Sequence, residues 1–214
     1  EYIGAYRFRH PTLVHVLLES AKANGRQKKL NHICAMVLEE IGEESSKERL
    51  GLHLMRSGEM EKGLLMQMEY INRLGDTFSR LEIDRRFDEI HQQITALGVA
   101  ENHFLWQRYH YNDETRQYHQ NNIPRVLEIQ EWLDQNLTDQ MLRGRFLQHR
   151  CYALSFTDVE SSEIHALVDE GLAIAKDLDS DFLAEILIRV QFDLVSKSLT
   201  DWLENLGKAE ELLS

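Results

Sequence analysis

The sequence predicts an all-α protein, specifically a right-handed α-solenoid of helical hairpins preceded by one short strand. Two observations predict this fold class. The 214 residues include only 2 prolines and 11 glycines, so long uninterrupted helices form easily, whereas a sheet-rich fold with many tight turns is disfavoured. From Thr12 onward, apolar residues recur at intervals of three and four, which is the spacing of one face of an α-helix.

The short strand is predicted over "AYRFRH", residues 5–10. In an extended segment Tyr6, Phe8 and His10 would point to one side, and the arginines between them to the other. Pro11 suits the first turn of the helix that follows, because its missing N–H would have no helical partner there in any case. The sequence thus places His10 between a strand and a helix N-terminus, a location that favours anionic groups.

A second helix is predicted over "LNHICAMVLEEI", residues 30–41. Its apolar residues form one stripe, as expected of a helix that faces a core. That stripe comprises Leu30, Ile33, Cys34, Val37, Leu38 and Ile41, with Asn31, Glu39 and Glu40 off it. Further helices are predicted over residues 46–57, 60–74, 78–97, 100–119, 123–136, 138–156, 160–178, 180–197 and 199–213. Between them, Gly58 is expected to end one helix, Pro124 to begin another, and "DSDFLAE" (179–185) to supply an Asp or Ser cap.

Two of these helices carry a repeat-like pattern. The segments "EIHALVDEGLAIAKDL" (163–178) and "DWLENLGKAEELL" (201–213) resemble the second helix of a tetratricopeptide-type hairpin, in which small residues let neighbouring helices approach. The period is about 40 residues, longer than the roughly 34 of the standard repeat, so the hairpins would be irregular and elongated. Each hairpin would rely on its neighbour to complete its core. A closed helical bundle has the same periodicity and stays an alternative.

Three segments carry a resemblance to a known family. They are "YRFRHPTLVHVLLES" (6–20), "LNHICAMVLEEI" (30–41) and "RLGLHLMRSGEMEKGLL" (49–65). Together they resemble the junction in bacterial signal-transduction ATPases with numerous domains, the STAND class, at which a winged-helix subdomain ends and tetratricopeptide-type repeats begin. The resemblance implies that residues 1–44 are a winged-helix tail with the first helices, and that residues 45–214 are helical repeats.

The same resemblance implies a role for His10. In the STAND class a histidine at this junction contacts the β-phosphate of bound ADP and holds a closed resting state, which exchange for ATP releases. ATP and ADP would then be cofactors of an intact parent protein with an upstream nucleotide-binding module, while this chain itself would hold none. An imidazole N–H that donates to phosphate suits the task. From the residues alone, His10 could equally cap the helix or pack beside Tyr6.

The segment "ENHFLWQRYHYNDETRQYH" (101–119) concentrates aromatic residues and histidines in one predicted helix. Trp106, Tyr109 and Tyr111 are candidates for a groove that binds a peptide or protein, because large amphipathic rings dominate interface energetics. Core packing is the alternative for two of the three. His103, His110 and Glu114 share a helix face at spacings of seven and four, but without a second set of ligands we expect no metal site.

Composition excludes several classes of function. The chain has 24 Lys and Arg against 36 Asp and Glu, and the resulting net charge of −12 argues against nucleic acid or an anionic membrane as a partner. No apolar run approaches the roughly 20 residues that span a bilayer. Cys34 and Cys151 lie far apart without a metal-binding or redox spacing, which predicts two reduced core thiols and a cytoplasmic protein. The sequence contains no phosphate-binding-loop, dinucleotide, nucleophile-elbow or zinc-protease motif, so we expect no catalysis by this chain.

Two functional expectations follow. The first is a non-catalytic sensor: a helical-repeat region of a STAND-type ATPase that binds a protein or peptide and controls nucleotide-dependent activation of the upstream module. The alternative is a stand-alone tetratricopeptide-like adaptor for protein–protein interaction. In that case residues 1–10 would be an edge or disordered segment, and the aromatic stretch 103–118 would line a peptide groove.

Overall fold

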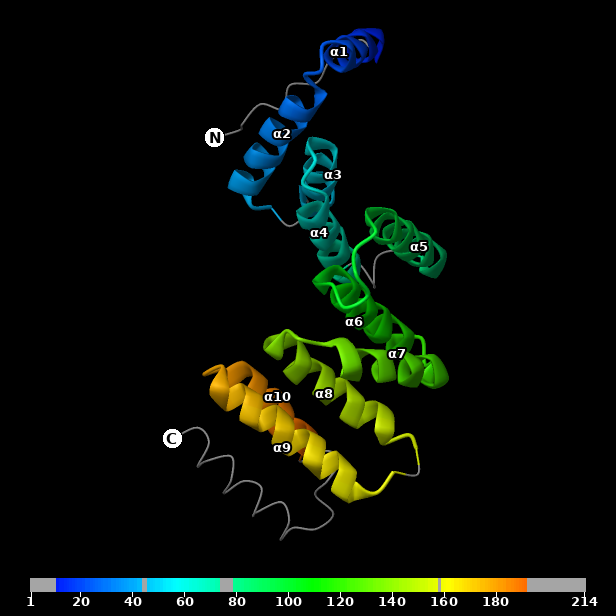
Figure 1. Cartoon of the computed structure of the whole chain (residues 1–214), viewed down its shortest axis with the longest axis vertical. Coiled ribbons are helices and arrows are strands. Elements are labelled where there is room, and N and C mark those ends of the chain that lie inside the picture. The colour runs from blue at the N-terminus through cyan, green and yellow to red at the C-terminus, as the bar shows by residue number, and fades with distance from the viewer. Residues whose placement is uncertain (1–10, 44–45, 74–78, 158, 192–214) are drawn as a thin grey trace. The chain divides into compact units, whose positions relative to one another are not determined.

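The computed structural model describes residues 11–43, 46–73, 79–157 and 159–191. Within these ranges the chain forms helices and no strand, which confirms the all-α class (Figure 1). The predicted strand with His10 and the predicted helix 199–213 lie outside the described residues. The helices are α1 (Pro11–Ala23), α2 (Gln27–Ile41), α3 (Lys47–Ser57), α4 (Met60–Arg73), α5 (Arg80–Leu97), α6 (Phe104–His119), α7 (Ile123–Asn136), α8 (Gln140–Leu154), α9 (Ser161–Asp177) and α10 (Asp181–Val190).

The chain divides into two compact units, residues 1–96 and 97–214. In the first unit α2 packs on α3 and α3 on α4. In the second, α6 packs on α7, α8 on α9, and α9 on α10, with α10 also against α8 (Figure 1). Helices that follow one another in the sequence therefore pack as sequential pairs, as the hairpin pattern predicted.

Local chemistry explains where helices begin and end. Gly42 and Gly58 close α2 and α3 in the left-handed region, at φ 65° and 104°, where a side chain would be strained. The Asp139 carboxylate caps α8 by accepting from the Leu142 N–H at 2.9 Å. The predicted cap of "DSDFLAE" is confirmed, since the Ser180 hydroxyl accepts from the Leu183 N–H at 3.3 Å.

Glycines set the closest approaches between helices. A Cβ placed on Gly63 in α4 would lie 2.7 Å from the carbonyl oxygen of Gly51 in α3, and one on Gly51 would lie 2.9 Å from that of Gly63. In the second unit Gly144 and Gly171 leave room for the side chains of Leu183 and Leu187. The expectation that small residues let neighbouring helices approach is therefore met, and Gly171 belongs to the very segment that suggested it.

Aliphatic and aromatic side chains fill the interior of each unit. In the second unit one cluster joins α7 and α8 and consists of Ile129, Leu133, Leu137, Leu142, Phe146 and Leu147. Another joins α8, α9 and α10 through Cys151, Ile164, Val168 and Val190. Burial raises the pKa of the Cys151 thiol to about 12. This cysteine is therefore the protonated core thiol that the sequence predicted.

The packing of α2 corrects the predicted orientation of its apolar stripe. The buried residues of this helix are Asn31 and Ala35 rather than the stripe. The side-chain oxygen of Asn31 accepts a hydrogen bond of 2.8 Å from the Nδ1–H group of His53 in α3, and Lys62 in α4 pairs with Glu39 at 3.0 Å. These polar contacts turn the Asn31 side of α2 toward α3 and α4. Leu38 of the predicted stripe still packs against the core cluster of Ala35, Leu50 and Leu54. The rest of that stripe is exposed, including Cys34, whose thiol is therefore not in the core.

Candidate functional site

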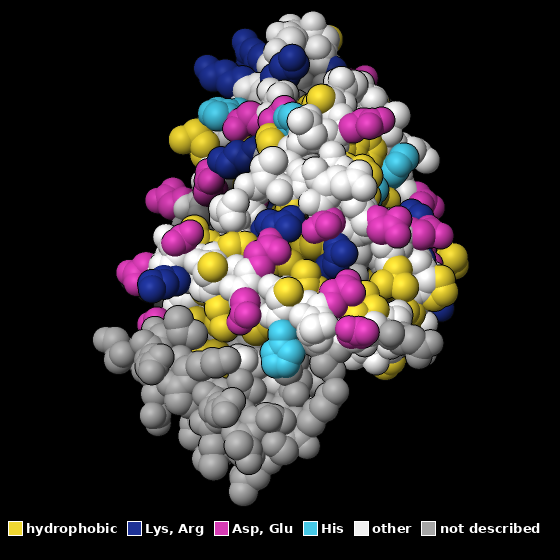
Figure 2. Space-filling model, turned by 60° about the horizontal axis from the view of Figure 1, so that its bottom comes forward, with side chains coloured by type: hydrophobic (Ala, Val, Ile, Leu, Met, Phe, Trp, Pro, Cys, Tyr) yellow, Lys and Arg dark blue, Asp and Glu magenta, His cyan; other side chains and the backbone are white. Residues whose placement is uncertain are grey.

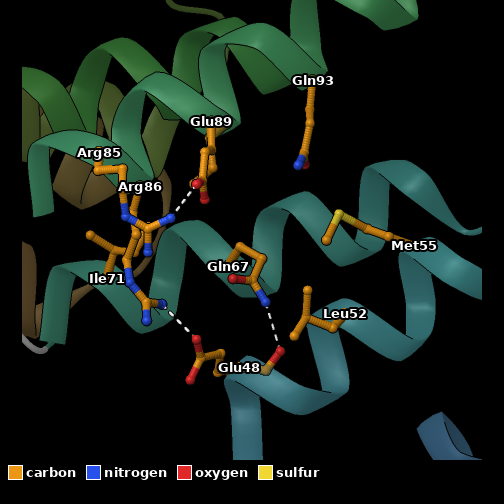
Figure 3. Close-up of a pocket in the computed structure, with 10 residues that line it drawn as sticks. Glu48, Leu52, Met55, Gln67, Ile71, Arg85, Arg86, Glu89 and Gln93 are labelled. Atoms are coloured by element: carbon orange, nitrogen blue, oxygen red, sulfur yellow. Dashed lines mark hydrogen bonds and ion pairs between the residues drawn. The ribbon is translucent and has the colours of Figure 1, made fainter. Parts of the chain in front are cut away.

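A cavity of about 120 Å³ lies among α3, α4 and α5 in the first unit (Figure 3). Its apolar wall is built by Leu52 and Met55 from α3, Ile71 from α4 and Ile90 from α5. Amide side chains reach it from two helices, Gln67 from α4 and Gln93 from α5. Ile71 and Ile90 are buried while Leu52, Met55 and Gln93 are half-exposed, so the cavity has a buried floor and an accessible mouth.

Ion pairs hold the rim of this cavity together. The guanidinium of Arg86 in α5 donates to Glu48 of α3 at 2.7 Å and to Glu82 of its own helix at 2.8 Å. Arg85 pairs with Glu82 at 2.7 Å and also with Glu89, as the sticks of Figure 3 illustrate for Glu89. The side chain of Arg86 is only 16% exposed. This arginine therefore ties α5 to α3 in a place where water screens the charges incompletely.

The Glu48 side of the cavity is fixed by further contacts. The backbone carbonyl of Glu48 accepts a hydrogen bond of 2.6 Å from the side-chain amide of Gln67, and this bond joins α3 to α4. Arg86 lies 5.9 Å from the centre of the Tyr70 ring, within the range of a cation–π contact. Burial, the charge of Glu48 and a hydrogen bond to that carboxylate raise the pKa of Tyr70. Tyr70 therefore stays a neutral phenol that can donate to Glu48.

The pKa of Glu82 tests whether its ion pairs with Arg85 and Arg86 form. Hydrogen bonds from Arg85 and Arg86 lower the pKa of Glu82 from an ordinary 4.5 to about 2. Because the folded value is the lower one, the pairs stabilise the fold fully above pH 4.5 and lose that contribution as the pH falls toward 2. We expect carboxyl-carbon NMR shifts to give a Glu82 midpoint near 2, and Arg85→Gln with Arg86→Gln to move it back toward 4.5. A wild-type midpoint of 4.5 would show that the arginines do not pair with it.

The cavity is suited to one kind of occupant. Clefts that enclose whole small molecules or cofactors measure about 300–1,000 Å³. A space of about 120 Å³ with aliphatic walls and two amides at its edge accommodates a single side chain instead. Within the described ranges, no group of three or more His, Cys, Asp or Glu side chains is arranged to hold a metal ion.

The three aromatic residues predicted to bind a partner do not share one open surface. Tyr109 is buried, whereas Trp106 and Tyr111 are half-buried. Trp106 meets Tyr109 edge-on, with ring centres 5.8 Å apart. Tyr111 packs against the α7–α8 core cluster, and burial raises its pKa to about 12. Trp106 and Tyr111 keep some accessible surface, and their contact with a partner stays a prediction.

The residues weighed as metal ligands point to different partners. The Nδ1 atom of His103 accepts from the Leu105 N–H at 3.3 Å and so caps the start of α6. His110 packs on the ring of Trp132 in α7, at 4.1 Å between ring centres. Glu114 instead turns into the interior of the second unit, where its side chain is fully buried.

A buried polar cluster around Glu114 is the feature that sequence reasoning missed. One carboxylate oxygen lies 2.8 Å from Nδ1 of His149 in α8, and the other accepts from the Gln130 amide of α7 at 2.8 Å. Tyr111 and Tyr118 stack on the His149 ring. The signal in the sequence was a glutamate among aromatic residues on a core face, but its partners lie 16 and 35 positions away. No local spacing could indicate them.

The cavity was also missed, for a similar reason. Glu82 and Arg86 are four residues apart on one helix, a spacing that does predict an ion pair. Glu48 and Arg86 are 38 positions apart, so only the packing of α5 beside α3 and α4 brings them together.

The rest of the described surface is mixed in chemistry. Acidic side chains are spread over the face in Figure 2, in keeping with the net charge of −12. Among the helices of the described ranges, none combines the length and apolarity needed to cross a bilayer. Comparison of the chain with protein-family models, curated proteins and solved structures gave no match.

Proposed function

We propose that this chain is a protein-binding helical-repeat region, a right-handed solenoid of tetratricopeptide-like hairpins that receives a peptide segment of a partner protein. The observation that carries the proposal is the cavity among α3, α4 and α5. Stacked helical repeats bind their partners on extended surfaces made by helices, and this cavity is lined by the α3–α4 pair and by the helix that follows it. The proposed partner inserts one side chain there.

The chemistry of the cavity indicates what the peptide offers. Leu52, Met55 and Ile71 favour an aliphatic or thioether side chain on the bound peptide. The flexible side chain of Met55 allows the cavity wall to adapt to anchors of different shapes. Gln93 at the mouth carries both a donor and an acceptor, which suits the backbone of a bound segment. Glu48 and Arg86 are already paired to each other and leave little net charge for the ligand to neutralise. A largely apolar anchor flanked by polar backbone contacts fits best.

The resemblance to STAND ATPases extends this proposal to a parent protein. There the repeats would act as a sensor that controls nucleotide-dependent activation of an upstream module in the cytoplasm, and His10 would contact the phosphate of ADP. The support is the "YRFRH" motif at residues 6–10, which lies outside the described residues. A phosphate-binding loop upstream in the parent sequence would favour the sensor, and its absence would favour the stand-alone adaptor.

The cavity can be tested by filling it. We expect Gln93→Trp to occupy the mouth and to weaken binding of peptides selected from a displayed random library at least tenfold, because the indole takes the space of the anchor. Gln92→Trp is the matched control, since Gln92 is the exposed neighbour of Gln93 on α5 and does not line the cavity. Isothermal calorimetry on the full chain measures both affinities.

Two results would contradict the cavity as the peptide site. One is equal affinity of the selected peptides for wild type and Gln93→Trp. The other is equal weakening by Gln92→Trp, because that would place the contact on the outer face of α5. Selected peptides that respond instead to changes at Trp106 would move the site to α6.

A further inference from the structure

Helix α2 carries an exposed apolar stripe. It differs from the predicted stripe in that it includes Met36 and lacks Leu38, which packs against the core. Five large side chains of this helix, which is four turns long, are between 46 and 57% exposed. They are Leu30, Ile33, Met36, Val37 and Ile41. Single exposed apolar side chains are ordinary, but a contiguous row along a whole helix marks an interaction surface. The exposed thiol of Cys34 lies within this row.

The charges on α2 oppose its own dipole. A helix is stabilised by acidic residues in its first turn and basic residues in its last, at about 0.3–1 kcal/mol each. α2 has no acidic residue in its first turn and no basic residue in its last. Instead, Lys28 and Lys29 stand at its start and Glu39 and Glu40 at its end. This order of charges disfavours the isolated helix and suits contact with a helix that runs the opposite way.

The position of these charges selects one arrangement. Lys29 and Glu40 are 11 residues apart, which places them on the same line of the helix within about 20° and about 16 Å apart. That line runs along one border of the apolar stripe, between Ile33 and Met36, on the side of α2 opposite Asn31, the residue that packs on α3. When two copies of α2 pack antiparallel about a two-fold axis, the border of one copy that carries Lys29 and Glu40 lies beside the same border of the other copy. The two borders run in opposite directions. Lys29 of each copy would then lie beside Glu40 of the other. In a parallel pair the two-fold axis would put these borders on opposite sides of the interface, so Lys29 and Glu40 could not pair between copies.

We propose that α2 is a self-association surface, on which a second copy of this chain packs antiparallel about a two-fold axis. The stripe supplies the buried apolar contact and the Lys29–Glu40 borders supply two equivalent ion pairs. Because the interface rests on one helix from each copy, the dimer is concentration-dependent rather than permanent. This surface lies apart from the peptide cavity, so either proposal can fail without the other.

Charge exchange tests the arrangement. Analytical ultracentrifugation of the full chain over a dilution series is expected to show a species of twice the 25.1 kDa chain mass. Lys29→Glu and Glu40→Lys should each raise the dissociation constant at least tenfold, because each leaves like charges opposed. The double variant, Lys29→Glu with Glu40→Lys, should return the dissociation constant to within about threefold of wild type. Each ion pair forms again in this variant, with the acidic and basic residues exchanged. Val37→Glu should abolish the dimer, while circular dichroism keeps its helical signal.

Cysteine cross-linking tests the two-fold axis. Cys34 lies near the middle of the stripe, so the two copies of Cys34 come close in the antiparallel pair, whereas Cys151 is fully buried. A short bis-maleimide should link two wild-type chains, and Cys34→Ser should remove the link while Cys151→Ser does not. A monomer at every concentration overturns the proposal, and so does a dimer that survives Val37→Glu. If the variant with both Lys29→Glu and Glu40→Lys does not regain association, the two copies of α2 do not pack antiparallel.

Discussion

Replacing Gly63 by alanine is expected to destabilise the first unit by about 2–3 kcal/mol, although alanine favours a helix by about 1 kcal/mol over glycine. The added Cβ would lie 2.7 Å from the Gly51 carbonyl oxygen and 2.9 Å from the Met55 backbone nitrogen. Both are backbone atoms of α3 and cannot rotate away. The helices must therefore separate, which disturbs packing at Leu50 and Leu54 and the hydrogen bond from Gln67 to Glu48.

The measurement has to report on the first unit alone. All three tryptophans, Trp106, Trp132 and Trp202, follow residue 97, so their fluorescence follows the second unit. Hydrogen exchange of α3 and α4 amides is therefore the readout, and it should quicken in the Gly63 variant while tryptophan fluorescence in urea stays unchanged.

Gly171→Ala serves as the matched control for this change. Its added Cβ would meet only the side chain of Leu187, at 2.7 Å from Cδ1, and a side chain can shift where a backbone cannot. We expect a smaller loss there. A gain in stability for Gly63→Ala would mean that α3 and α4 do not cross at this glycine.

The second large effect concerns the buried carboxylate. His149→Leu is expected to destabilise the second unit by about 1–3 kcal/mol, because it removes one of the two hydrogen-bond partners of the fully buried Glu114 carboxyl group. Replacing both members of a buried pair by apolar residues is far less costly than removing one. Glu114→Leu added to His149→Leu should therefore recover part of the loss, which simple addition of two destabilising changes would not produce.

Urea unfolding followed by tryptophan fluorescence measures the free energy of unfolding of the single and the double variant. Trp132 reports on this unit because it packs against the core cluster of α7 and α8. His119→Leu is the control, because His119 is an exposed histidine on the same helix as Glu114. A double variant that is less stable than His149→Leu alone would contradict the pairing of Glu114 with His149.

Sequence reasoning located the helices well because their ends depend on neighbouring residues. The predicted segments 123–136 and 46–57 lie within a residue of α7 and α3. Gly58 and Ser180 acted as the terminator and the cap that their residue types predicted. The segment 100–119 was less accurate at its start, since the helix begins at Phe104 after a His103 cap that has no strong preference in sequence.

The candidate sites were predicted less well. Aromatic residues on α6 were visible as a concentration of rings, but periodicity does not distinguish a buried ring such as Tyr109 from an accessible one. The sequence predicts that the apolar stripe of α2 faces the core, but the structure buries Asn31, which accepts a hydrogen bond from His53 of α3. The cavity forms only where side chains of three helices, α3, α4 and α5, come together, so no pattern within a single helix can predict it.

By itself, the sequence determined that the described part of the chain is helical and that its helices pair in order, because apolar spacing, caps and glycines act over a few residues. Only the tertiary structure decided which face of α2 is covered, that Arg86 meets Glu48, and that Glu114 meets His149. The physical reason is the distance in sequence between the partners. A side chain's burial and charge environment are set by residues far along the chain, which become neighbours only when the helices pack.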